Sequence, residues 1–74
     1  MYYIVKNQDV DGEYFKKFKR FSNAAKYFED MSGYSIEKAL NFYYYEGEVP
    51  SFEKVGYAKM VSDYGNVVSI EVVN

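Results

Sequence analysis

Apolar and polar positions along the chain predict short elements rather than long ones. The aromatic and β-branched run at residues 2–6 predicts a strand, and Asp11-Gly12 predicts a tight hairpin turn after it. Residues 13–21 fit two patterns, because their rings suit either a strand or a helical stripe. We favour the strand. The helical alternative would use Tyr14, Phe18, Phe21, Ala25 and Phe28 as one face.

Two helical patterns follow. Ser22 suits the N-cap of the first helix, and Gly33 suits its end. Ser35 suits the N-cap of a second, shorter helix, which Gly47 can end, although its last residues could instead form a strand. The apolar faces would contain Ala24, Ala25, Phe28 and Met31 in the first helix, and Ile36, Ala39, Leu40 and Tyr43 in the second.

The C-terminal third predicts two more strands. Val49-Pro50-Ser51 breaks the pattern, after which residues 52–62 and 67–73 favour strands joined by a turn at residues 63–66. In the last strand, Val68, Ile70 and Val72 form a purely apolar face that should point into the core. The predicted order is β-β-α-α-β-β. We therefore expect a single α+β domain over residues 1–74, with helices packed on one face of a small antiparallel sheet.

Composition excludes several kinds of chemistry. The chain contains no cysteine and no histidine, so it has no disulfide, no thiolate or imidazole zinc ligand and no Ser-His-Asp triad. Apolar residues make up 49% of the 74 residues, which predicts a core that supports itself. The start has no basic leader and only a short apolar run. We therefore expect a cytoplasmic protein that does not enter membranes.

Motifs for metal binding and catalysis are weak. The pattern Asn7-x-Asp9-x-Asp11-Gly12 matches the first half of a calcium loop, but Phe18 stands where the final bidentate glutamate is needed. A hairpin turn is the favoured interpretation. Glu46, Glu48 and Glu53 are close in sequence, but no neighbouring residues predict the apolar pocket that would raise a carboxyl pKa. We expect no enzyme activity, no metal and no cofactor.

A basic stretch offers one candidate binding site. Four cationic side chains alternate with rings, a mixture suited to phosphates and stacked bases, and they are Lys16, Lys17, Lys19 and Arg20. On a strand, half of these would point to each face. We favour a solvated edge strand protected by lysines, and keep nucleic-acid or nucleotide binding as the alternative.

The run Tyr43-Tyr44-Tyr45 is the second candidate. No single buried face can hold three successive residues, so at least one tyrosine should be exposed, although the phenols could also lie at the core edge with their hydroxyls in water. Residues 27–53 carry six acids against one lysine, which would add an acidic rim. The predicted partner-binding residues are Tyr43, Tyr44, Tyr45, Glu46, Glu48, Phe52 and Glu53.

The amino-acid composition suggests the kind of genome that encodes this chain. Eight lysines to one arginine, together with ten tyrosines, favour a gene rich in A and T. In size and style the chain resembles the small accessory proteins of phages of low-GC bacteria, some of which inhibit host defences. The resemblance implies a non-enzymatic inhibitor or modulator of a host protein with a basic surface, acting in the host cytoplasm. A homodimer whose tyrosines bury between two copies is a further alternative.

Overall fold

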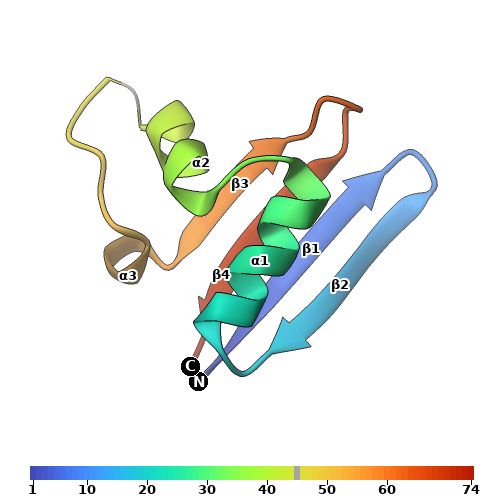
Figure 1. Ribbon diagram of the computed structural model, residues 1–74, viewed down its shortest axis with the longest axis horizontal. Coiled ribbons are helices and arrows are strands. Elements are labelled where there is room, and N and C mark those ends of the chain that lie inside the picture. Colours follow the sequence, from blue (N-terminus) through green and yellow to red (C-terminus); the bar gives the residue numbers. More distant parts are fainter. Residues whose placement is uncertain (45) are drawn as a thin grey trace.

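The computed structural model describes residues 1–44 and 46–74 and forms one antiparallel sheet with helices on one face (Figure 1). The strand order is β2-β1-β4-β3. The predicted fold class is confirmed, with a third short helix added. The strands are β1 (Tyr2–Asp9), β2 (Gly12–Phe18), β3 (Tyr57–Val61) and β4 (Val67–Val73), and the helices are α1 (Phe21–Ser32), α2 (Ile36–Tyr43) and α3 (Phe52–Val55).

The two central strands come from opposite ends of the chain. β1 pairs with β4 from Tyr2 opposite Val73 to Gln8 opposite Val67, so the N and C termini lie side by side (Figure 1). β2 and β3 form the two edges of the sheet. The first and last strands therefore form the centre of the sheet, and each edge strand pairs with one of them.

The predicted hairpin at Asp11-Gly12 is confirmed. β1 and β2 pair up to Asp9 opposite Gly12, which leaves Val10 and Asp11 as the turn. Asp9 Oδ1 accepts hydrogen bonds from the backbone nitrogens of Asp11 at 2.8 Å and of Gly12 at 3.1 Å. This aspartate therefore closes the turn with its own side chain.

The start of α1 corrects the prediction. The strand is confirmed to Phe18, but the helix begins at Phe21 with Arg20 at the N-cap, so Ser22 lies inside the first turn. The reason is tertiary packing, because the Phe21 ring stands 5.6 Å from Tyr3 and 5.3 Å from Phe52 between ring centroids. Such contacts compete with a side-chain cap that is worth only about 1 kcal/mol. The helix ends at Gly33 as predicted, in a left-handed conformation.

The second helix begins as predicted. Ser35 Oγ accepts a hydrogen bond from the Lys38 backbone nitrogen at 3.1 Å, which confirms its role as N-cap. The helix ends at Tyr43, four residues before Gly47, and the Tyr44 backbone nitrogen still donates to the Leu40 oxygen at 2.9 Å.

The third helix was not predicted. Residues 52–55, expected to begin a strand, form one helical turn in which Ser51 Oγ accepts from the Lys54 backbone nitrogen at 3.3 Å. Gly56 then adopts φ of +68°, and the strand starts at Tyr57. In the sequence, this short helix is indicated by the capping serine Ser51 before Phe52 and by Gly56 after Val55.

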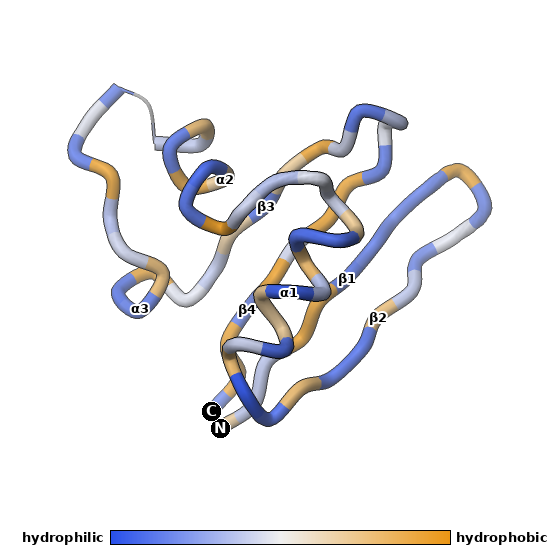
Figure 2. Tube along the Cα trace, in the orientation of Figure 1, coloured by the Kyte–Doolittle hydropathy of each residue, from blue (hydrophilic) through white to orange (hydrophobic). Residues whose placement is uncertain are grey.

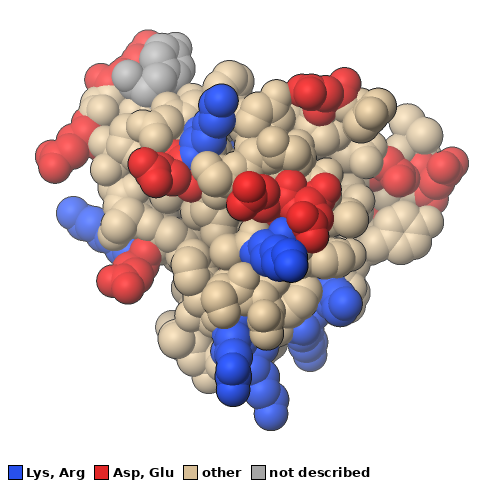
Figure 3. Space-filling view, in the orientation of Figure 1, with Lys and Arg blue, Asp and Glu red and all other residues tan. Residues whose placement is uncertain are grey.

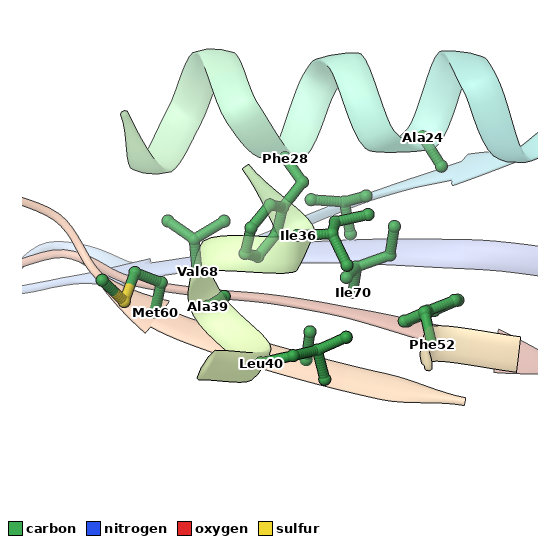
Figure 4. Close-up of a cluster of buried hydrophobic side chains, with 11 residues drawn as sticks. Ala24, Phe28, Ile36, Ala39, Leu40, Phe52, Met60, Val68 and Ile70 are labelled. Carbon is green, nitrogen blue, oxygen red and sulfur yellow. The ribbon is translucent and has the colours of Figure 1, made fainter. Parts of the chain in front are cut away.

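The core lies between the sheet and the helices. Phe28 points from α1 toward the sheet (Figure 4), and with Val5, Val68 and Ile70 it is among the largest fully buried side chains. Apolar residues recur along α1 and β4 (Figure 2). The alternation predicted for the last strand is confirmed at Val68 and Ile70, which are buried under the helices, whereas Val72, the third residue of the predicted face, is half-buried.

Candidate functional site

Two large aromatic side chains are exposed to solvent at the end of α2. Phe42 is 69% exposed and its neighbour Tyr43 is 58% exposed. Tyr44 is half-buried and packs against the core, with its ring centroid 5.0 Å from that of Tyr43. The prediction that at least one tyrosine of the run is exposed is confirmed by Tyr43. Tyr45 lies outside the described residues.

The exposure of Phe42 follows from its position around α2, whereas the exposure of Tyr43 corrects the sequence prediction, which placed Tyr43 on the apolar face with Leu40. Tyr43 is the last residue of α2 and lies beyond the buried part of the helix. The helix buries Ile36, Ala39 and Leu40 against the rest of the fold. Phe42 comes two residues after Leu40, which places it about 200° around the helix axis on the opposite side. The sequence prediction did not include Phe42, although its position two residues after Leu40 places it on the outer side of a helix.

Carboxylates follow these rings along the chain. Glu46 and Glu48 are exposed and, together with Tyr43, Tyr44 and Gly47, line a shallow hollow of about 230 Å³. The sequence contains no lysine or arginine between Lys38 and Lys54. We call Phe42, Tyr43, Glu46 and Glu48 the aromatic–acidic corner.

Two predicted residues fall outside this corner. Phe52 is only 9% exposed and its ring belongs to the core, where it packs on Phe21. Glu53 is exposed in the first turn of α3 and lines a different hollow. Because Phe52 is buried and Glu53 lines another hollow, we leave both out of the corner.

The four basic residues of the second candidate do not share a face. Lys16 pairs with buried Val5 and therefore lies on the helix side, where its Nζ stands 5.3 Å from the centroid of the Tyr27 ring. Lys17 lies on the opposite face, with its Nζ 5.1 Å from the Tyr2 ring. Lys19 and Arg20 are exposed in the bend before α1. Figure 3 shows most of the basic side chains of this face gathered where β2 leads into α1.

No helix among residues 1–44 and 46–74 covers the other face of the sheet (Figure 1). Phe15, Tyr57 and Val61 are exposed there. A shallow hollow of about 300 Å³ crosses the strands and is lined by charges of both signs, Lys6 and Lys59 among Glu13 and Glu71, with Gln8, Tyr57, Val67 and Ser69. The lining of this hollow therefore carries no single sign of charge.

The surroundings of Tyr34 shift the pKa of its phenol. Tyr34 Oη donates a hydrogen bond to Asp63 Oδ1 at 2.6 Å. That hydrogen bond, and then the negative charge of Asp63, raise the pKa of Tyr34 above its usual value. This hydrogen bond ties the α1–α2 connection to the turn before β4.

Two further kinds of site were sought among residues 1–44 and 46–74. No three acidic side chains in these ranges gather closely enough to hold a metal ion. No helix in them is both long and apolar enough to cross a bilayer.

Together these features define a small α+β protein with one sheet face covered and one open. No protein family, curated protein or solved structure was found to match the chain. Its function is therefore inferred from its exposed surfaces.

Proposed function

We propose that the chain is a non-enzymatic binding protein that docks on a basic surface of a partner protein through the aromatic–acidic corner. The observation that carries the proposal is the exposure of two adjacent rings, Phe42 at 69% and Tyr43 at 58%. Burying such a ring stabilises a protein or complex by roughly 1.5–3 kcal/mol. Phe42 and Tyr43 are exposed in the free chain, so their burial against a partner would contribute this free energy to binding. Exposed aromatic side chains are typical anchors of protein interfaces.

Charge narrows the class of partner. Glu46 and Glu48 line the hollow beside Tyr43, and the sequence has no cationic residue between Lys38 and Lys54. A basic patch would complement this corner and speed the encounter. Proteins that handle nucleic acids carry such patches, and the resemblance to phage accessory proteins favours a host protein of this kind, which the chain would inhibit or modulate.

The rings are tested by a double change, Phe42→Ser with Tyr43→Ser. A tagged wild-type chain first captures the partner from a nuclease-treated lysate of a low-GC bacterium, and calorimetry then measures affinity for the purified partner. Because a buried aromatic anchor is worth about 2 kcal/mol or more, the double variant should bind at least about 100-fold more weakly. Tyr64→Ser is the matched control, since Tyr64 is 95% exposed in the distant turn before β4.

Charge reversal separates the acidic rim from the rings. Glu46→Lys with Glu48→Lys should slow association and reverse its salt dependence, whereas Asp11→Lys in the first hairpin should not. Unchanged affinity in both double variants would exclude the corner. Sedimentation of the wild-type chain shows whether the rings instead join two copies.

Nucleic-acid binding is the second candidate, and one observation favours it. Phe15 is exposed on the open face, where it pairs with Lys6 and is followed on the same face by Lys17. A ring between lysines can stack on a base while the cations contact phosphates. Fluorescence anisotropy with a labelled oligothymidine at low salt tests this. No rise in anisotropy would remove the candidate, as would binding that survives Lys16→Ala, Lys17→Ala, Lys19→Ala and Arg20→Ala together.

A further inference from the structure

A groove runs between the helices on the covered side of the molecule. It has a volume of about 590 Å³ and lies between α1, α2 and the segment that leads into α3. This volume falls in the range of about 300–1,000 Å³ typical of ligand pockets. We call it the interhelix groove, and its residues are separate from those of the aromatic–acidic corner.

The groove is lined mainly by apolar side chains. Phe21, Ala25, Leu40 and Phe52 line it, and Phe21 is 41% exposed although its ring contacts Phe52. A second hollow of about 500 Å³ shares Phe21 and Phe52 and continues past Tyr3 toward the chain termini. The apolar surface is therefore continuous around one ring pair, and it can take the side chain of a bound molecule.

The charged residues that line the groove all have one sign. Glu29 of α1 and Glu37 of α2 stand on its two sides, and Glu53 lines the second hollow. Neither hollow has a lysine or arginine among its described lining residues. Carboxylates on both sides of an apolar floor would repel a phosphate backbone or a fatty acid and attract cations.

We propose that the interhelix groove binds a basic segment of a partner protein, with one apolar side chain seated on Phe21 and Phe52. Lysine or arginine residues on either side of that anchor pair with Glu29 and Glu37. The anchor supplies apolar burial and the flanking cations supply the orientation. This site uses residues that the proposed function does not, and the inference does not rest on the aromatic–acidic corner.

Two synthetic peptides test the proposal on the full chain. Ac-KKLFKK-amide and Ac-EELFEE-amide share the same apolar pair and differ only in charge. In an NMR titration of the ¹⁵N-labelled protein, the basic peptide should give saturable shifts at Ala25, Leu40 and Phe52. Its affinity should exceed that of the acidic peptide by about tenfold or more, because two ion pairs are gained instead of two repulsions.

Surface variants locate the site. Glu29→Lys with Glu37→Lys should remove the preference for the basic peptide, whereas Asp11→Lys with Glu13→Lys should keep it. All four acids are exposed, so a well-dispersed spectrum shows that each variant folds. The proposal is overturned by equal affinity for the two peptides, by shifts centred outside the groove, or by no saturable shift. Phe42→Ser with Tyr43→Ser should leave peptide binding intact, which separates this site from the corner.

Discussion

At the scale of single residues, Gly56 ends α3 and contacts β4. It ends α3 in a left-handed conformation, and its carbonyl oxygen accepts a hydrogen bond from the Val72 backbone nitrogen at 3.0 Å. A Cβ atom at this position would lie 2.8 Å from Val72 Cγ1. Both the backbone conformation and the close approach therefore require glycine.

Gly56→Ala should lower the free energy of unfolding by about 1–3 kcal/mol, since it adds backbone strain and a steric clash. Urea denaturation followed by circular dichroism measures the change. Gly47→Ala is the control, because its backbone is not left-handed and a Cβ atom there meets no heavy atom within 4 Å. If the two variants are equally stable, the tight contact with Val72 does not contribute.

At the scale of elements, the helix starts are held in two different ways. α2 and α3 have Ser35 and Ser51 at their N-caps, and the hydroxyls of these serines accept backbone hydrogen bonds. α1 begins at Phe21 with Arg20 at its N-cap; Arg20 makes no side-chain cap hydrogen bond, and the Phe21 ring instead packs on Tyr3 and Phe52. Local capping therefore predicts the position of α2, whereas tertiary packing sets the start of α1.

Ser35→Ala should destabilise the protein by about 1 kcal/mol, because it removes an N-cap hydrogen bond. Ser22→Ala should be nearly neutral, since Ser22 lies inside the first turn of α1 and alanine favours helix. Thermal unfolding of the two variants compares them directly. A larger loss in Ser22→Ala than in Ser35→Ala would show that the sequence pattern, and not the structure, places the start of α1 correctly.

At the scale of the whole molecule, folding depends on joining the chain ends. β1 and β4 form the centre of the sheet, and fully buried Val5 and Ile70 face each other across this pair. Their pairing spans nearly the whole sequence and must offset a large loop-closure entropy. Neither terminal segment can therefore be removed without exposing the core.

A chain that ends at residue 66 should fail to fold, which a collapsed amide NMR spectrum would show. A circular permutant is the control: a short glycine-serine linker joins Asn74 to Met1, and the chain opens between Val10 and Asp11. Because the termini are adjacent, the permutant should keep a dispersed spectrum with all four strands. A folded truncated chain would contradict the central role of β4.

The sequence by itself determined the features that depend on near neighbours. The alternation of Val68 and Ile70 set the buried face of β4, Gly33 and Ser35 set the boundary between the helices, and the tyrosine run indicated an exposed ring. Capping, turn formation and the period of side chains along a strand act within a few residues. They can therefore be predicted from the local pattern.

Only the tertiary structure decided which rings are buried and which surfaces remain. Phe52 was predicted to be part of an exposed patch and lies in the core, whereas Tyr43 was predicted on the apolar face of α2 and is exposed. The interhelix groove joins Phe21 to Leu40 and Phe52, residues far apart in sequence. Whether an apolar side chain is covered depends on which distant segment packs over it, and no local pattern contains that information.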